Sequence, residues 1–421
     1  MATSTPTTAQ KTILVLGGSY GGTGVAHSTL KHIIPKLPSP ETYTVVLVSS
    51  SREIIVRPAF PRALISDSFF DQTKLWTDLE AGFKQYGDKF KFVHGIATAF
   101  DAEARVVTVS PKDGGESEEV KIEYHALVIA TGSSTPSPLL SLNSGGRDEL
   151  KVHWNAFRTA LPTAKSIIIA GGGPVGIETA GELGEHLNGR AGFFASKLSD
   201  PKVKITVISK DTEILPVMRP ALAQAAEGYL AKVGVEVVKG VSVESVSPSE
   251  AGRKGEEVTA KTEVTLSDGK TMQADLFIPA YGTVPNTGFV PEVLRAKDGR
   301  VETNSKTLRV DKAGDRVYAV GDASNYARPA VHIMMDAVPV LAANLKRDLL
   351  IAAGQTPPGD DRLLTADEGE TQLVPIGRSK GVGAFKGTKL PSFFVWLFKG
   401  RDYFVGMTGG MWSGQNWAKD I

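Results

Sequence analysis

The sequence predicts an α/β fold, because two apolar, β-branched runs each end in a glycine-rich turn that leads into helix-forming sequence. The first turn, at residues 17–22, has the sequence Gly-Gly-Ser-Tyr-Gly-Gly, and the second, at residues 171–176, has Gly-Gly-Gly-Pro-Val-Gly. A strand, a tight glycine turn and a helix N-terminus together bind the pyrophosphate of a dinucleotide. Two such motifs in one chain predict two Rossmann-like domains, one for a flavin dinucleotide and one for a nicotinamide dinucleotide.

The chain of 421 residues is too long for a single core, so we expect several domains. We predict an FAD-binding domain from residues 10–145 and 283–350, an NAD(P)-binding domain at 146–282, and a small C-terminal α+β unit at 351–421. A Ser-, Pro- and Gly-rich link at 133–147 marks the first boundary. Each nucleotide domain also contains a later buried strand that ends in glycine, which indicates an internal repeat.

Composition excludes several classes of function. The 47 Lys and Arg residues nearly balance the 46 Asp and Glu residues, so no strong field is available to attract nucleic acid. Cysteine is absent, which excludes disulfides, thiolate metal sites and a redox-active dithiol. Electrons therefore leave the flavin directly, and we expect no metal site.

The candidate FAD-binding residues come from the first turn and from later strand ends that reach the same edge of the sheet. Ser49 occupies the position that usually carries an acid for the adenosine ribose; serine hydroxyls or Glu53 are possible substitutes, and a solvated serine turn is the alternative. Arginine at 57 or 62 is expected to hold the pyrophosphate, or else to lie on the surface. The full set is Gly17, Gly18, Ser19, Tyr20, Gly21, Gly22, Ser49, Arg57, Arg62, Ala130, Thr131, Gly132, Gly321 and Asp322.

The candidate NAD(P)-binding residues follow the second turn in the same way. They are Gly171, Gly173, Gly176, Glu178, Ser209, Lys210 and Gly282. Specificity for NADH usually needs an acid at the end of the second strand, where it binds the ribose 2′-hydroxyl and repels a 2′-phosphate. Ser209 stands there beside the cation Lys210. We therefore expect NADPH to be accepted as well as NADH.

Other segments carry weaker signals. Residues 90–120 alternate apolar and polar residues around Asp113-Gly114-Gly115, which predicts an antiparallel hairpin. The apolar run at 393–398 is expected to form a buried strand, or to line, with Trp412 and Trp417, an apolar entrance for a quinone or a contact with a membrane surface. His332 is a candidate general base, with a hydrogen-bonded structural histidine as the alternative.

The N-terminal segment, residues 1–10, is polar and has neither the apolar core of a signal peptide nor the arginine bias of a transit peptide. Alanine at position 2 excludes N-myristoylation. No apolar run approaches the ~18 residues that a membrane-spanning helix needs. We expect a cytoplasmic protein, with possible peripheral contact to a membrane or mitochondrial surface.

In their order along the chain, both glycine turns, Ala130-Thr131-Gly132, Pro285-Asn286 and the segment 318–322 resemble the pyridine-nucleotide:disulfide oxidoreductase superfamily without its disulfide. The resemblance covers almost the whole chain. The tail, at 374–383 and 393–403, is similar to that of the apoptosis-inducing-factor-like AMID flavoproteins, also called ferroptosis suppressor proteins, which are relatives of type II NADH dehydrogenases.

This resemblance implies a glutathione-reductase-like fold with FAD in the first domain, NADH or NADPH in the second, and a quinone or similar small molecule as electron acceptor. The implied reaction is hydride transfer from nicotinamide to flavin, which needs no protein nucleophile. Three positions depart from the family pattern, namely Ala2, Ser19 and Ser49. The alternatives are a tailoring oxidoreductase of secondary metabolism and a flavin-bound apoptosis or stress signalling protein. The oligomeric state stays open.

Overall fold

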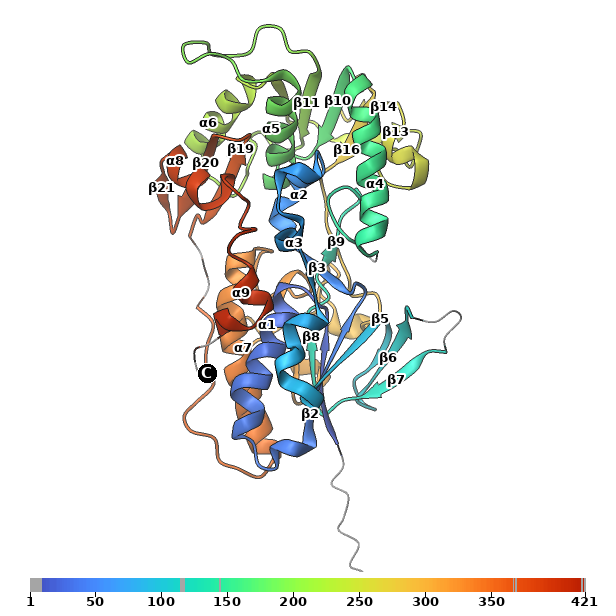
Figure 1. Ribbon diagram of the computed structural model, residues 1–421, viewed down its shortest axis with the longest axis vertical. Helices are drawn as coiled ribbons and strands as arrows, with labels where there is room; N and C mark the ends of the chain where they lie inside the picture. The colour runs from blue at the N-terminus through green and yellow to red at the C-terminus, as the bar shows by residue number, and fades with distance from the viewer. Residues whose placement is uncertain are drawn as a thin grey trace, which may run out of the picture.

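The computed structural model describes residues 10–113, 118–143, 145–365, 367, 369–417 and 419. Two α/β units lie end to end along the long axis, and a small C-terminal unit lies beside the upper one (Figure 1). The predicted α/β class is confirmed. Two earlier expectations lie outside the described residues: the turn at Gly114-Gly115, and the absence of a signal peptide, which depends on residues 1–9.

The lower unit is built on a seven-stranded sheet in which strands from distant parts of the chain lie side by side. Its five parallel strands are, in spatial order, β18 (Val317–Ala319), β8 (Ala126–Ile129), β1 (Lys11–Leu16), β2 (Tyr43–Ser49) and β5 (Phe90–Asp101). The antiparallel strands β6 (Val106–Pro111) and β7 (Val120–Glu123) continue from β5, which confirms the predicted hairpin from residue 95 onward, whereas residues 90–94 pair in parallel with β2. The helices α1 (Tyr20–Ser28) and α7 (Val331–Ala352) pack against each other beside this sheet (Figure 1).

The upper unit repeats this design on a smaller scale. Its parallel sheet has the order β12 (Val235–Lys239), β11 (Lys204–Ser209), β10 (Ser166–Ala170) and β16 (Leu276–Pro279). Three helices belong to it: α4 (Arg147–Ala160), α5 (Pro174–Asn188) and α6 (Pro220–Ala231). A second, antiparallel sheet is formed by β13 (Val243–Ser247), β14 (Thr262–Leu266) and β15 (Thr271–Ala274).

The C-terminal unit contains β19 (Gln372–Ile376), β20 (Lys380–Phe385) and β21 (Thr388–Leu390). The strand predicted at 393–398 is wrong, because this run forms α8 (Ser392–Val395) and a π-helical turn (Trp396–Gly400). Within this helical run, Val395 is the one fully buried side chain. It lies against Gly381 and Gly383 of β20, and a Cβ added to either glycine would come within 2.8 Å of the Val395 side chain. A helix therefore fits because the glycines of β20 leave room for one side chain. No helix among the described residues is long and apolar enough to cross a membrane.

Residues 409–417 fold back onto α1 and include α9 (Gly409–Trp412). His27 binds the carbonyl oxygen of Trp412 at 3.0 Å, and His32 binds that of Trp417 at 2.6 Å. Trp412 is 2% exposed and Trp417 is 7% exposed. The expectation that these two tryptophans line a surface entrance or touch a membrane is therefore wrong, because they belong to the core of the lower unit.

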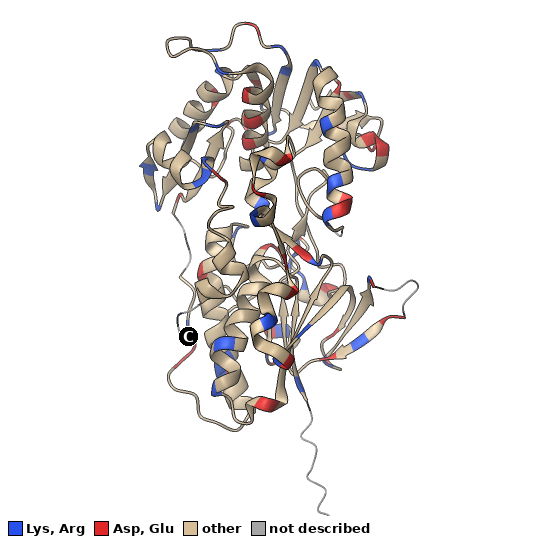
Figure 2. Ribbon diagram, in the orientation of Figure 1, with Lys and Arg blue, Asp and Glu red and all other residues tan. Residues whose placement is uncertain are grey.

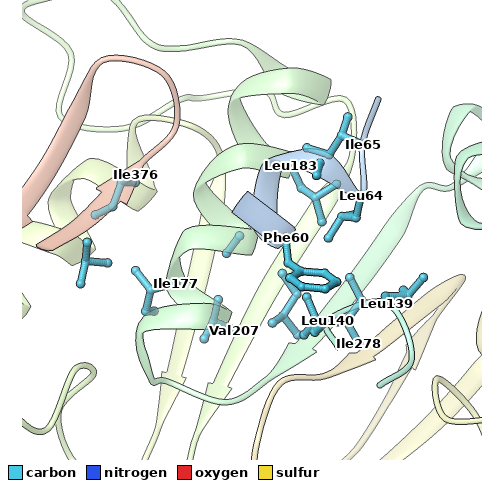
Figure 3. Close-up of a cluster of buried hydrophobic side chains, with 14 of the residues drawn as sticks. Phe60, Leu64, Ile65, Leu139, Leu140, Ile177, Leu183, Val207, Ile278 and Ile376 are labelled. Atoms are coloured by element: carbon cyan, nitrogen blue, oxygen red, sulfur yellow. The ribbon is translucent and has the colours of Figure 1, made fainter. Parts of the chain in front are cut away.

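A buried ionic cluster joins the three units. Arg62, on α2 (Phe60–Ala63), makes two hydrogen bonds of 2.8 Å to the carboxylate of Glu182 on α5. The hydroxyl of Tyr403 donates to the same carboxylate at 3.0 Å, and the Arg62 guanidinium also donates to the carbonyl of Arg401 at 3.1 Å. Apolar side chains from all three units, including Phe60, Leu183 and Ile376, pack in one core cluster (Figure 3).

Replacing Arg62 by methionine is expected to lower the free energy of unfolding by about 3–5 kcal/mol, because it leaves the Glu182 carboxylate buried without its cation. The double variant Arg62→Met/Glu182→Gln is expected to recover part of this loss. Urea unfolding followed by circular dichroism measures both. Lys270→Met, which removes an exposed ion pair with Asp268, is the matched control and is expected to change stability by less than about 1 kcal/mol. A similar loss in both single variants would contradict the burial argument.

His27 is expected to make the protein less stable as the pH falls below neutrality. Burial lowers the pKa of His27 to about 4, a hydrogen bond to the Trp412 carbonyl partly opposes this shift, and Lys31 adds to it. An unfolded histidine has a pKa of about 6.5, so the unfolded chain takes up the proton first, and stability is lost between roughly pH 6.5 and 4.

From pH 7 to pH 5 the loss attributable to His27 is expected to be about 2 kcal/mol. The free energy of unfolding is measured across this pH range for the wild type and for His27→Gln. Subtracting the two profiles removes the contribution of all other titrating groups. Parallel pH profiles for the two proteins would show that His27 does not titrate in this way.

Candidate functional site

The carboxyl ends of β1, β2, β8 and β18 open into a cavity of about 430 Å³. All the residues expected to bind FAD line this cavity except Gly22 and Arg62. The positions that the sequence analysis selected from distant segments are thus brought together at one edge of one sheet. Ligands of parallel α/β sheets bind at this edge, because the strand ends and the helix N-termini converge there.

In the first glycine turn, neighbouring backbone lies so close to Gly17 and Gly22 that neither position has room for a side chain. Gly17 has a φ of +113°, and an added Cβ would overlap the carbonyl oxygen of Ala130. A Cβ at Gly22 would overlap the carbonyl oxygen of Gly17, so Gly22 acts in packing and not in lining the cavity. Ser19 is the N-cap of α1, and its side chain makes no capping hydrogen bond. The helix therefore directs its uncapped amides at the cavity, which favours an anion.

The serine at the end of β2 fits closely against the turn. An added Cβ at Gly18 would lie 2.7 Å from the Cβ and Oγ of Ser49, so the small serine side chain is accommodated against the glycine backbone. The Ser49 hydroxyl accepts a hydrogen bond from the Ser51 amide at 3.3 Å. Glu53, the other candidate for the ribose, lines the cavity but forms an ion pair with Arg147 at 2.9 Å. Ser49 is thus a polar group that lies directly beside the turn, and Ser50 and Ser51 line the cavity next to it.

Asn286 joins the two strand ends that close the cavity, although the sequence analysis treated Pro285-Asn286 only as a turn. Its side chain donates to the carbonyl of Thr131 at 3.0 Å, and the Thr131 hydroxyl donates to the carbonyl of Asn286 at 2.7 Å. Ser133 donates to Asp322 at 2.9 Å, and within the described residues only this one oxygen of the Asp322 carboxylate is engaged. The other oxygen is available to accept a hydrogen bond from a polyol such as a ribityl chain.

Two polar groups in the cavity, one buried and one half-buried, lack strong partners. The hydroxyl of Tyr20 makes no hydrogen bond within the described structure, and the Arg57 guanidinium makes one long contact of 3.4 Å with the carbonyl of Ser133. Burial raises the pKa of Tyr20, so its hydroxyl stays protonated. Burial lowers the pKa of Arg57, and Asp322 opposes this change. An arginine stays charged even so, so the cavity holds a cation and a hydroxyl donor that suit the pyrophosphate of FAD.

Arg62 lies elsewhere and does not have the predicted cofactor role. Its guanidinium is occupied by Glu182 in the buried cluster described above. His332 also lies outside the cavity: its Nε2 atom pairs with Asp367 at 3.0 Å, while its neighbours Ala330 and Val331 line the cavity. This geometry fits the structural alternative for His332 and not the role of a general base.

The second turn has the same construction as the first. An added Cβ at Gly171 would overlap the carbonyl of Ala280, and one at Gly176 would overlap the carbonyl of Gly171. Gly173 is the N-cap of α5, and a Cβ there would meet no atom. Gly282, just after β16, has a φ of +65°. Side chains at two of these glycines would collide with backbone, and α5 offers the same kind of anion site as α1.

Glu178 does not face this second site as a free carboxylate. It is 2% exposed and pairs with Lys399 of the C-terminal unit, whose ammonium also donates to the carbonyl of Leu373 at 3.1 Å. Burial raises the pKa of Glu178 to about 7, and Lys399 acts in the opposite direction. Glu178 therefore does not have the expected role in binding NAD(P). Its ion pair with Lys399 holds the C-terminal unit against α5.

Comparison with known proteins agrees with this architecture. The sequence profile described as pyridine nucleotide-disulphide oxidoreductase matches residues 11–338. The chain is 55% identical over 421 residues to oxidoreductase phnG of Penicillium herquei, covering all of both chains. It is 24% identical to ferroptosis suppressor protein 1 of Xenopus laevis, covering 93% of each chain. The solved sulfide:quinone oxidoreductase of Aquifex aeolicus has a similar fold, with a TM-score of 0.69 at 16% identity over 96% of this chain and 92% of that one. The chain belongs to the pyridine nucleotide-disulphide oxidoreductase family, whose members of the ferroptosis-suppressor type it resembles.

Proposed function

We propose that this protein is an FAD-dependent NAD(P)H oxidoreductase that delivers electrons to a quinone or a similar small acceptor. The observation that carries the proposal is the pair of identically built glycine turns, the first of which opens into a cavity with a cation and an unpaired hydroxyl. Family membership supports FAD and a nicotinamide dinucleotide as the reactants. The chain has no cysteine to relay electrons through a dithiol, so the acceptor has to react at the flavin.

The residues of the chain bind and orient, and none acts as a nucleophile. When bound, FAD accepts a hydride from the nicotinamide and releases electrons to the acceptor. The α1 amides and Arg57 would hold the pyrophosphate, and Asp322 would accept a hydrogen bond from the ribityl chain. Asn286 fixes the segment that carries Thr131, and Ser133 in the same segment donates to Asp322. The rigid support of these groups aligns the two reacting rings.

The C-terminal unit offers a surface that suits a lipid-soluble acceptor. Phe393, Phe394 and Phe398 are exposed by 60%, 42% and 48%, although they belong to one short helical segment. Trp396 packs against Phe393, with ring centroids 5.7 Å apart. Residues 371–407 contain six Lys or Arg and one acid, and Figure 2 shows positive residues at the outer corner near β21 and α8. Aromatic side chains beside cations favour an anionic lipid surface, so we propose peripheral membrane contact here, at a cytoplasmic membrane face.

Among the relatives, the support for a quinone acceptor comes from the name of the sulfide:quinone oxidoreductase, whose fold this chain shares. The relative phnG, at 55% identity, is named simply an oxidoreductase. This favours a second candidate function, a tailoring oxidoreductase acting on an organic substrate with the same cofactors. The two functions differ in whether simple quinones reoxidise the reduced flavin.

The purified protein is expected to be yellow, to lose its flavin absorbance when NADH or NADPH is added without oxygen, and to regain it when a quinone is added. Stopped-flow absorbance at the flavin band measures each step. Bleaching followed by reoxidation with short- and long-tailed quinones supports the proposal. A flavin that bleaches but is reoxidised by none of the quinones would contradict a quinone acceptor and favour the tailoring function.

The aromatic surface is tested in the same assay. Phe393→Ser/Phe398→Ser is expected to slow reoxidation by long-tailed quinones in liposomes about tenfold and to leave water-soluble quinones unaffected, because only the former need the surface. Phe193→Ser is the matched control, since Phe193 is 89% exposed on a loop of the upper unit, outside the C-terminal unit. Equal rates of flavin reoxidation in all three proteins would show that the C-terminal surface takes no part in the reaction with quinones.

Lys210 is expected to select for the 2′-phosphate of NADPH. It is exposed, it follows Ser209 at the end of β11, and it makes no ion pair within the described residues. The nearby acid Glu213 is already engaged by Lys239 at 3.4 Å. The variant Lys210→Glu is expected to raise the Michaelis constant for NADPH about tenfold and that for NADH less than about twofold.

Lys204→Glu, at the opposite end of β11, is the control and is expected to change neither constant. Steady-state kinetics with both coenzymes measure the ratio. Equal changes for NADH and NADPH in Lys210→Glu would show that Lys210 does not contact the phosphate.

A further inference from the structure

Tyr20 occupies an unusual position in the cavity. It is the first residue of α1, it is 7% exposed, and its hydroxyl has no hydrogen-bond partner in the described structure. A buried hydroxyl without a partner is costly, so this one is explained by a ligand atom that it would contact. Arg57 lines the same cavity, and its guanidinium makes one long contact of 3.4 Å with the carbonyl of Ser133. The positive end of α1, a cation and a hydroxyl donor thus line the same cavity, and this combination suits a phosphate.

The aromatic ring of Tyr20 packs against residues 409–417. The indole of Trp412 meets it edge to face, with the ring centroids 4.8 Å apart and an interplanar angle of 68°. Such a contact restricts the tilt of the phenol and therefore the direction of its hydroxyl. The carbonyl of Trp412 is itself fixed by His27 at 3.0 Å, and it lies where a side chain at residue 82 would be, a position that glycine leaves empty. The tryptophan that positions Tyr20 is therefore itself held rigidly.

The rest of the segment is attached to the same helix and to its π-helical continuation. Lys31 donates to the carbonyl of Gly414 at 2.9 Å, and His32 binds the carbonyl of Trp417 at 2.6 Å. An added Cβ at Gly24 would lie 2.7 Å from the Trp417 ring, so the indole sits directly on the helix backbone. Residues 409–417 thus dock on the outer face of the helix whose N-terminus faces the cavity. Within this segment, Trp412 is in ring contact with Tyr20.

We propose that residues 409–417 are part of the FAD-binding site, where Trp412 positions Tyr20 so that its hydroxyl, together with Arg57, donates hydrogen bonds to the pyrophosphate of FAD. Tyr20 contacts the cofactor, and Trp412 is a positioning residue that acts through Tyr20. The inference rests on the proposed function only for the identity of the cofactor, and it is independent of the electron acceptor.

The test measures cofactor affinity without turnover. Apoprotein is titrated with FAD, following the quenching of flavin fluorescence, and with ADP, by calorimetry, because ADP carries the pyrophosphate but no flavin. Tyr20→Phe, which removes only the hydroxyl, is expected to weaken both FAD and ADP about tenfold. Trp412→Leu is expected to weaken both by a similar factor, and Trp412→Phe, which keeps an aromatic edge, to restore most of the affinity.

The decisive comparison is the double variant Tyr20→Phe/Trp412→Leu. If Trp412 acts through Tyr20, the double variant binds FAD no more weakly than Tyr20→Phe alone, since the hydroxyl is already absent. A purely structural role of the segment would instead give additive losses, and additivity would overturn the proposal. Phe193→Ser, at an exposed aromatic residue outside the segment and outside the cavity lining, is the control and is expected to bind both ligands as the wild type does.

Circular dichroism and thermal unfolding of each apoprotein separate affinity from folding. If Trp412→Leu does not fold, the pair Trp412→Phe and Tyr20→Phe still decides. Wild-type ADP affinity in Tyr20→Phe would overturn the pyrophosphate assignment. A wild-type protein that binds no FAD would overturn both this inference and the proposed function, whereas normal FAD binding without electron transfer to quinones affects only the latter.

Discussion

The close approach of backbone to backbone at the glycine turns is the constraint on which the rest of this structure depends. A single Cβ at Gly22 would overlap the carbonyl of Gly17, and one at Gly176 would overlap that of Gly171. Because no side chain intervenes, α1 and α5 begin directly at the ends of β1 and β10, and their first amides point beyond the sheet edge. The cavity exists where the other strand ends meet this point. Every group assigned to the cofactor is placed relative to these contacts.

The sequence predicted the parts of the site that local backbone geometry requires. Gly17, Gly132 and Gly321 all have positive φ values at turns that end buried strands, and each of these turns reaches the cavity. Long-range charge pairing was not predictable in this way. The partner of Arg62 lies 120 positions away in the chain and that of Glu178 lies 221 positions away, so no local pattern distinguishes a cofactor ligand from half of a buried ion pair.

The tail shows a second limit of sequence reasoning. An apolar run without alternation fits a buried strand and a helix equally well, and at 393–398 the choice depends on two glycines of β20 that accommodate Val395. Likewise, the burial of Trp412 and Trp417 depends on glycines more than 300 residues earlier: Gly24 leaves room for the Trp417 ring, and Gly82 leaves room for the Trp412 backbone carbonyl. Small residues create the space and large residues fill it, and only the fold reveals which pairs meet.

The return of the chain to its own beginning has a consequence for biogenesis. Strand β18 completes the first sheet only after the whole upper unit has been synthesised, and residues 409–417 cover α1 later still. The upper unit, whose parallel sheet is formed by residues 166–279, is continuous and is complete on the ribosome before the lower one. The first α/β unit to be translated is therefore the last to be finished, and the covering of α1 is complete only after residues 409–417 have left the ribosomal tunnel.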